Sequence, residues 1–437
     1  MNGTVVKGGY LLSGEEVKAN WGVRVEGDSI VKIAPNNELI VQRGDRLIEA
    51  LDKLVAPGFI NGHMHMYGVL SHGISVDAAV SDFSDFLEDF WWPYVENRID
   101  HRLIEVTSRW ACVEMIKSGV TSFLEVLEGP NSIPGALELE KKVIEAAGLR
   151  AWLSFEACER VSGENGRLGL KENADFIREN NSSNNLVQGL MSIHTLFTGN
   201  KSFVMRAKEL AGELDVDIHM HLSESTYEPG WVEQKYGKSP VELYDEWGYL
   251  DKRVIASQAV QLDPSEVKTI AQRRCRVIHM PLSNCEVGGG VAPVPDYLDY
   301  GVPTGLGTDG YINNFFEVMR GAFLIHKAYR RKPEIMPAQM VYQMATSRGA
   351  AAVGCNQVGA LKEGYKADLI TINLDTPTPV NEKNVYDQLV LFRNPEDVAE
   401  VMVNGRLLKQ EGRLLTIDEN SAKEDLRGAT EEFWKMK

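Results

Sequence analysis

The chain has little cysteine, fewer basic than acidic residues and no long apolar run, and each shortage excludes a class of protein. The five cysteines are scattered, odd in number and without a Cys-x-x-Cys pair, so we expect reduced thiols in a cytosol. Lysine and arginine total 46 against 62 aspartates and glutamates, and the net charge of -16 argues against a nucleic-acid partner. No apolar stretch approaches the roughly eighteen residues of a membrane span, and the N-terminus lacks the apolar core of a signal peptide. We therefore expect a cytoplasmic protein that acts on a small molecule, with no nucleic-acid or membrane partner.

The 437 residues exceed what one hydrophobic core usually holds, although a single barrel with appendages would accommodate them. The 43% hydrophobic and 25% charged residues are ordinary for a globular protein, so the composition does not indicate disorder. Two structural units are expected.

Strand-like and helix-like patterns divide the chain into a central part and two similar ends. Both ends contain short alternating runs broken by turn signals, whereas the central part alternates apolar strand-like runs with helical patterns, which is typical of a parallel sheet. The central runs are 54–60, 119–126, 150–155, 186–193, 216–222, 254–258, 275–280 and 302–307. Eight such strands are the number that closes a barrel. The sequence thus predicts an α/β protein with a (β/α)8 TIM-type barrel at 56–358 and a small β-sandwich formed by 1–55 together with 359–437.

Polar residues follow most of these runs. His63 and His65 lie two apart in an extended segment, where side chains alternate faces, so both imidazoles can point at one ion. The polar residues that follow the later runs are His194, His221, Glu224, Gln258, His279 and Asp309. Because the loops at the C-terminal ends of barrel strands carry catalysis, we expect these side chains to form one site.

A metal centre is the chemistry that this set predicts. The expected ligands are His63, His65, His221 and Asp309, since three imidazoles and one carboxylate suit Zn²⁺ or Fe²⁺ and leave a position for water. We expect one divalent metal ion per chain, zinc before iron, which would lower the pKa of that water towards about 7. Glu224 is placed to act as general acid/base on the water, and His279 could steady a developing negative charge or the metal-bound hydroxide.

Several short motifs, in this order, are similar to those of one family. They are Pro57-Gly58-Phe59-Ile60-Asn61 before His63-Met64-His65, His221-Leu222-Ser223-Glu224, His279-Met280-Pro281-Leu282-Ser283-Asn284, Leu306-Gly307-Thr308-Asp309-Gly310 and Gly364-Tyr365-Lys366-Ala367-Asp368-Leu369. Together they resemble the amidohydrolase superfamily, in particular its branch of guanine, S-adenosylhomocysteine and methylthioadenosine deaminases and triazine hydrolases. The resemblance implies a mononuclear metal site, hydrolysis of a carbon–nitrogen or carbon–chlorine bond on an electron-poor heterocycle, and a homodimer.

Gln258 departs from this resemblance. The deaminases of the branch usually have a histidine at the end of the sixth strand, whereas an amide cannot become cationic near neutral pH. Some triazine hydrolases resemble this arrangement, so the leaving group stays open between ammonia, an amine and chloride.

Six residues are predicted to contact the substrate: His194, Gln258, Trp91, Trp92, Glu125 and Asn313. For His194 the alternative is a hydrogen-bonded structural histidine. Trp91 and Trp92 belong either to an amphipathic helix that packs on the barrel or to a lid that stacks on a flat substrate. His219 is expected to be hydrogen-bonded internally, and His72, His101 and His326 to do no chemistry.

The leading hypothesis is a metal-dependent hydrolase. Its favoured form is a deaminase that releases ammonia from a purine, pterin, pyrimidine or triazine ring. The alternative within the enzyme class is a triazine-type chlorohydrolase or amine-releasing hydrolase, and the alternative of another class is a catalytically silent barrel that binds a partner. Gly305-Leu306-Gly307-Thr308-Asp309-Gly310 also matches Gly-x-Gly-x-x-Gly, but its glycines begin inside the strand and no acidic residue completes a dinucleotide-binding unit.

Overall fold

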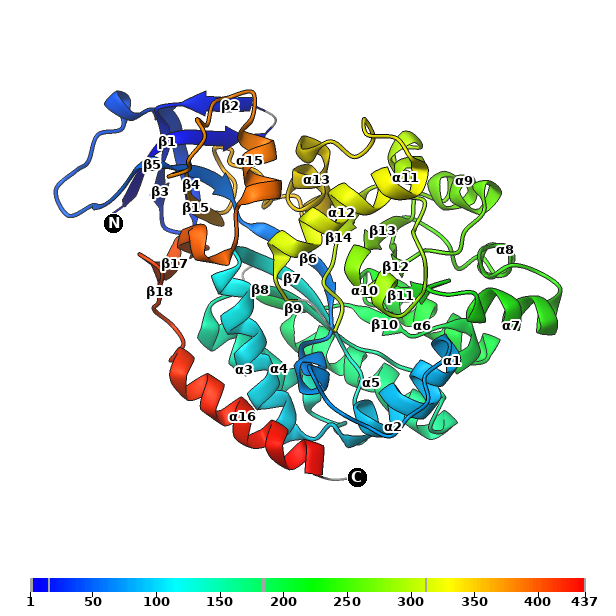
Figure 1. The fold of residues 1–437 in the computed structure, drawn as a ribbon. Helices are drawn as coiled ribbons and strands as arrows, with labels where there is room; N and C mark the ends of the chain where they lie inside the picture. Colours follow the sequence, from blue (N-terminus) through cyan, green and yellow to red (C-terminus); the bar gives the residue numbers. More distant parts are fainter. Residues whose placement is uncertain (1–2, 15, 183–184, 311–312, 436–437) are drawn as a thin grey trace.

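The structure is a computed structural model that describes residues 3–14, 16–182, 185–310 and 313–435. It contains two sheets, a nearly closed parallel barrel and a separate mixed sheet formed by strands from both ends of the chain (Figure 1). None of the helices in these ranges is long and apolar enough to cross a membrane.

The barrel strands follow one another in the order β10-β11-β12-β13-β14-β6-β7-β8-β9, and every pair is parallel. They are β6 (Phe59–Met64), β7 (Val120–Leu127), β8 (Arg150–Phe155), β9 (Val187–Gly189), β10 (Met191–Ile193), β11 (Ile218–Leu222), β12 (Val254–Gln258), β13 (Arg276–His279) and β14 (Thr304–Leu306). Most of their residues are buried, because helices cover the outside and side chains fill the inside of a parallel barrel. The short strands β9 and β10 are the two parts of one predicted run, separated at Leu190.

Helices surround the barrel. Those associated with it are α1 (Phe83–Asp85), α2 (Trp92–Tyr94), α3 (His101–Lys117), α4 (Ala136–Ala147), α5 (Gly163–Asn180), α6 (Lys201–Glu213), α7 (Tyr227–Tyr236), α8 (Pro240–Glu246), α9 (Pro264–Gln272), α10 (Pro281–Glu286), α11 (Val294–Asp299), α12 (Phe315–Arg330), α13 (Ala338–Met344) and α14 (Ser347–Ala352). Short helical segments are η1 (Asn36–Glu38), η2 (Met66–Ser71), η3 (Phe86–Trp91, a π-helix), η4 (Glu96–Arg98), η5 (Leu196–Thr198) and η6 (Pro395–Asp397). Several helices begin at a side-chain cap: Asp100 accepts from the Leu103 N–H and Asp263 from the Glu266 N–H.

The second sheet joins the two ends of the chain in the order β18-β17-β16-β15-β5-β1-β3-β4, with β2 paired to β1. Its strands are β1 (Thr4–Ser13), β2 (Glu16–Ala19), β3 (Trp21–Glu26), β4 (Ser29–Pro35), β5 (Arg46–Pro57), β15 (Leu369–Asn373), β16 (Val398–Val403), β17 (Arg406–Gln410) and β18 (Arg413–Leu414). The junction between the ends is the antiparallel pair β5·β15, in which Leu54 lies opposite Ile372.

One predicted strand is divided between the two sheets. The apolar run 54–60 was expected to open the barrel, but Leu54 and Val55 belong to β5 of the mixed sheet, and the barrel strand β6 begins only at Phe59. The chain passes from one sheet to the other at Gly58, where a Cβ would lie 2.1 Å from Thr121 Cγ2, so only glycine fits.

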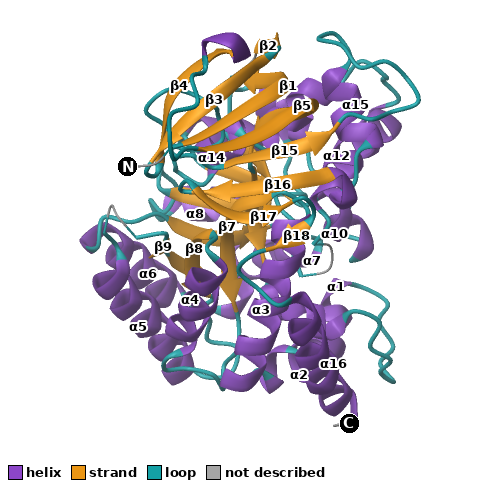
Figure 2. Cartoon of the chain, turned by 90° about the vertical axis from the view of Figure 1, so that its left-hand side faces the viewer, coloured by secondary structure: helices purple, strands orange, loops and turns teal. Residues whose placement is uncertain are grey.

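The end of the chain returns to the barrel. Helix α16 (Glu419–Lys435) packs along α3, and the two helices lie side by side in both views (Figures 1 and 2). Helix α15 (Val385–Phe392) packs on α12 and α13. The predicted domain boundaries, 56–358 for the barrel and 1–55 with 359–437 for the second domain, remain a proposal.

Candidate metal and catalytic site

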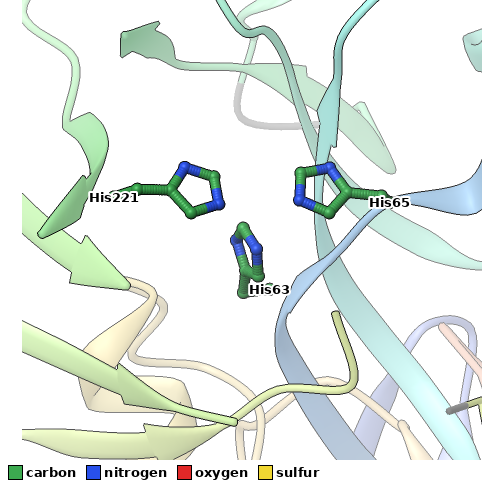
Figure 3. Close-up of side chains that lie close together, drawn as sticks. All are labelled: His63, His65 and His221. Atoms are coloured by element: carbon green, nitrogen blue, oxygen red, sulfur yellow. The ribbon is translucent and has the colours of Figure 1, made fainter. Parts of the chain in front are cut away.

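Three histidines converge inside one end of the barrel. His63 lies in β6, His65 directly follows it, and His221 lies in β11 on the opposite side. One ring nitrogen from each lies within 4.8 Å of the others, and the three rings face a common point (Figure 3). The predicted imidazole ligands are therefore together.

A different partner occupies Nδ1 of each ring. His63 Nδ1 lies 3.1 Å from Nε2 of His219, and His65 Nδ1 lies 2.6 Å from the carbonyl oxygen of Val126. His221 Nδ1 lies 2.6 Å from Oε1 of Glu156, a close contact that is not an aligned hydrogen bond. These contacts orient the rings and leave Nε2 as the atom that can face an ion.

Nε2 of His63 is the atom that most directly indicates an ion. It is fully buried and has no hydrogen-bond partner among the described residues. A buried polar atom without a partner is rare in proteins, and three imidazoles converging on one point suit a divalent cation such as Zn²⁺. Burial lowers the pKa of His63 well below its ordinary value and also lowers the pKa of His221, so both rings are neutral near pH 7, the form that binds metal.

Asp309 completes the set from the loop after β14. Its Oδ1 lies 3.6 Å from His65 Nε2 and accepts a hydrogen bond from the Gly310 N–H, while Oδ2 accepts from Ser283 Oγ at 2.9 Å. Burial raises the pKa of this carboxyl, but His65 and His221, together with the hydrogen bonds from Gln258 and the Gly310 N–H, bring it below its ordinary value. Asp309 is therefore an ionised carboxylate beside the three rings.

Gln258 binds this carboxylate instead of facing the cavity. Its Nε2 donates to Asp309 Oδ2 at 2.6 Å, and its Oε1 accepts from Asn284 Nδ2. Gln258 is fully buried at the end of β12. We expected it to contact the substrate, but the structure gives it a role in holding Asp309.

A small cavity of about 30 Å³ lies beside the histidines. It is lined by His65, Phe83, Phe86, Leu87, Trp91, Glu96, Glu156, His194, His221, Glu224, Ser283, Val287 and Asp309. This volume is about that of one water molecule, so a heterocycle fits only if part of the wall moves. The aromatic segment that includes α1 and η3 supplies the apolar part of the wall.

Glu224 faces this cavity three residues after His221. Enclosure by protein raises the pKa of its carboxyl well above the ordinary value, and the charges of Asp309 and Glu156 add to that effect. A carboxyl with a raised pKa binds a proton more strongly than an exposed carboxyl does, which suits a group that takes a proton from water and passes it on. The geometry agrees with the predicted role of general acid/base.

The other predicted residues divide into two groups. His194 and Trp91 line the cavity, as predicted, and His219 is hydrogen-bonded internally between His63 and Ser192 Oγ, as expected. Trp92 lies behind the wall, with its ring near His194 and under the Arg160 guanidinium.

Besides Gln258 and Trp92, the structure keeps three further predicted residues away from the cavity. The carboxylate of Glu125 accepts from the Met66 N–H, so it fixes the backbone that follows His65. The side-chain amide of Asn313 donates to Glu114 in a separate groove. His279 points outwards to α12, where its Nε2 lies 3.1 Å from Nε2 of His326.

Two further buried carboxylates, Glu156 and Glu96, belong to the cavity wall. Glu156 follows β8, and its position at a strand end makes it a candidate specificity residue from the sequence alone. Glu96 lies in η4, away from any strand, and nothing in the sequence pattern marks it; its carboxylate accepts from Tyr67 Oη at 3.0 Å and pairs with Arg160.

Comparison of the sequence with known proteins gives a consistent result. The model of the amidohydrolase family matches residues 54–408. The chain is 29% identical to 5'-deoxyadenosine deaminase of Methanosphaera stadtmanae, over 98% of each chain. It is 32% identical to 5-methylthioadenosine/S-adenosylhomocysteine deaminase of Carboxydothermus hydrogenoformans, over 92% of this chain and 91% of the other.

A solved structure shares the fold. An adenosine deaminase from Xanthomonas campestris with bound zinc superposes with a TM-score of 0.88 at 22% identity and covers 98% of both chains. This likeness confirms the predicted barrel. The histidine cluster of this chain supports a divalent metal ion. The predicted resemblance is also confirmed: the chain is a hydrolase that belongs to the amidohydrolase family, and the relatives named above are deaminases of small heterocyclic substrates by name.

Proposed function

We propose that the chain is a zinc-dependent hydrolytic deaminase of adenine nucleosides that carry no phosphate, of the 5'-deoxyadenosine or 5'-methylthioadenosine type. The relatives of similar length bear these names. In the reaction, water supplies the new carbonyl oxygen on the ring. One of its protons stays on a ring nitrogen, and the other leaves with the amino group as ammonia.

The observation that carries this proposal is the joint placement of the metal-type cluster and Glu224 around one cavity. His65, His221, Asp309 and Glu224 all line it, and His63 lies directly behind. A binding module that had lost catalysis would not need a carboxyl of raised pKa beside this set.

The residues divide the work as follows. A divalent ion held by His63, His65, His221 and Asp309 would lower the pKa of a water molecule towards about 7. Glu224 takes a proton from the attacking water and delivers it to the ring. His194 and Trp91 contact the heterocycle from the cavity wall, and the aromatic segment excludes bulk water once it closes.

The charge of the wall favours a nucleoside over a nucleotide. Glu96, Glu156, Glu224 and Asp309 all face the cavity, and none of the described residues that line it is lysine or arginine. Arg160, the nearby cation, is paired with Glu96 at 3.0 Å and also with Glu128. A phosphate would therefore meet carboxylates without a free cation to balance it.

A second candidate, a triazine-type chlorohydrolase, is favoured by Gln258. An atrazine chlorohydrolase, TrzN of Arthrobacter aurescens, complexed with zinc, superposes with a TM-score of 0.85 at 19% identity, over 99% of this chain and all of the other. Release of chloride from a chlorotriazine would distinguish this candidate from the first.

Elemental analysis of the purified protein together with an ammonia assay tests the proposal. We expect one zinc ion per chain, with iron(II) as the alternative, and ammonia from 5'-deoxyadenosine and 5'-methylthioadenosine but not from adenosine 5'-monophosphate. Glu224→Gln should lower kcat by about a hundredfold to ten-thousandfold with unchanged metal content, because the amide cannot carry the proton. Ammonia from none of the nucleosides, or full turnover in Glu224→Gln, would contradict it.

We also propose that the chain forms a homodimer and that it is cytoplasmic. Size-exclusion chromatography with light scattering would test the first.

A further inference from the structure

Glu228 connects two loops of the site through its side chain. It lies in the first turn of α7 and is buried, with only 2% of its surface exposed. Its Oε1 accepts a hydrogen bond from the Leu196 N–H at 2.9 Å, and its Oε2 accepts one from the Ser223 N–H at 2.6 Å. One carboxylate thus binds the backbone of two separate segments.

Each of these segments carries a residue of the cavity. Leu196 follows His194 by two positions and is the first residue of η5, which comes after β10. Ser223 lies between the ligand His221 and the proton carrier Glu224, after β11. Glu228 is therefore one hydrogen bond away from both loops, although the cavity lining does not include it.

The backbone at Ser223 needs support. Its φ of 47° is left-handed, a conformation that is unfavourable for a residue with a Cβ. On the other side of this residue, its carbonyl accepts from the N–H groups of Val260 and Gln261. The peptide before Glu224 is thus held from α7 on one side and from the loop after β12 on the other.

We propose that Glu228 is a positioning residue for the reaction, one that fixes the proton carrier Glu224 and the substrate-contacting His194 at a constant separation. The inference rests on the proposed function for its kinetic consequences, but the contacts themselves do not depend on the substrate.

Only a carboxylate can do this. Both backbone groups are donors, so both side-chain atoms must accept. In Glu228→Gln, one oxygen becomes an NH₂ donor that faces an N–H, and one buried backbone donor is left without a partner. Glu228→Asp keeps both acceptors but is shorter by one carbon, so it reaches one loop and not both.

The test compares Glu228→Gln and Glu228→Asp with the wild type, all loaded with zinc. We expect kcat to fall about tenfold to a hundredfold, as for other residues that orient a catalytic group, and KM for 5'-deoxyadenosine to rise because His194 shifts. Metal content should stay at the wild-type value. A merely structural role would lower the folded, metal-bound fraction and leave KM unchanged. Glu233→Gln, an exposed position in the same helix, is the matched control and should change neither constant.

Hydrogen exchange read by mass spectrometry tests the contacts without any substrate. We expect faster exchange in at least one of the segments 194–198 and 222–226 in each Glu228 variant, and in neither segment of Glu233→Gln. Unchanged exchange together with unchanged kcat and KM would overturn the proposal. If the wild type releases no ammonia, the proposed function fails, and the exchange experiment still decides the role of Glu228. If Glu228→Gln does not fold, Glu228→Asp carries both measurements.

Discussion

At the scale of single residues, some side chains contact the candidate metal ligands but do not line the cavity. Gln258 is one: it donates to Asp309 Oδ2 at 2.6 Å and accepts from Asn284. Such outer contacts fix the orientation of a ligand and tune its charge. Their loss typically lowers metal affinity by about tenfold to a hundredfold.

A pair of substitutions at this position separates orientation from chemistry. Gln258→Leu removes the N–H donor to Asp309 and leaves the Asn284 amide without its acceptor, so we expect zinc affinity to fall by about tenfold to a hundredfold. Gln258→His keeps one donor and one acceptor and is expected to keep the affinity near that of the wild type. Competition with a chromogenic chelator measures both. Equal affinity in all three proteins would show that Gln258 does not hold the ligand.

The sequence predicted that the candidate ligands lie close together because their positions follow from strand periodicity. Residues at the C-terminal ends of barrel strands lie on one face of the barrel. This rule predicts that His63, His65, His221 and Asp309 lie close together. The rule failed at His279, the last residue of β13, because residue parity decides whether a side chain points in or out, and the register that sets this parity is a tertiary property. It could not find Glu228 either, since that residue acts through backbone groups of loops far away in the sequence.

Backbone strain at the strand ends was also invisible in the sequence. Ser223, Gln258 and Asp309 all have positive φ, at the ends of β11, β12 and β14. Strained residues of this kind gather at functional sites, where surrounding contacts hold them. A glycine at such a position would have indicated positive φ in the sequence. These three residues are not glycine, because their side chains or contacts are needed there.

At the scale of elements, a buried ion pair connects the barrel to the mixed sheet. Arg150 in β8 donates to both carboxylate oxygens of Asp368, at 2.9 and 3.2 Å, and also to Asn404. The side chain of Asp368 is 1% exposed and that of Arg150 is 11% exposed. The pair therefore lies in a place where either charge alone would be expensive.

Asp368→Asn is expected to lower the free energy of unfolding by about 3 kcal/mol, because it leaves the buried guanidinium without a counter-charge. Urea denaturation followed by circular dichroism measures this. Asp375→Asn, at an exposed position shortly after β15, serves as the control and should change the free energy of unfolding by less than about 0.5 kcal/mol. Equal stability of the two variants would mean that the ion pair does not hold the sheets together.

The sequence predicted the elements better than it predicted their partners. The alternation of strand and helix gave the barrel, since each βα unit has its own periodicity. It did not show that the run 54–60 serves two sheets, because one apolar run fits either sheet and only the close approach of Gly58 to Thr121 separates them. An amphipathic helix likewise shows that it packs, but not on what.

At the scale of the whole molecule, the C-terminal helix α16 joins the end of the chain to the metal-site end of the barrel. It contacts α3 through ion pairs, Arg109 with Asp425 and Lys117 with Glu419. Near its end, Trp434 Nε1 donates to the carbonyl of Leu70 at 2.8 Å, in η2, the segment that follows His65. A contact between the chain terminus and this segment was not predictable from local patterns.

Phe433 is the apolar anchor of this helix. Its ring is fully buried, and the Arg98 guanidinium lies 3.9 Å from the ring centroid. Phe433→Ala removes that burial and leaves a cavity, so we expect a loss of about 3–5 kcal/mol in the free energy of undocking α16. Leu415→Ala, at a residue that is 52% exposed, should change it by less than about 0.5 kcal/mol.

Hydrogen exchange distinguishes undocking of α16 alone from a wider effect. If the helix holds η2 through Trp434, the amides of 66–71 and of 419–435 should lose protection together in Phe433→Ala, because opening of one releases the other. Loss of protection in α16 alone would show that η2 is held by the barrel. Joint loss would mean that the end of the chain stabilises the backbone next to His65, so that its removal should weaken zinc binding as well as the fold.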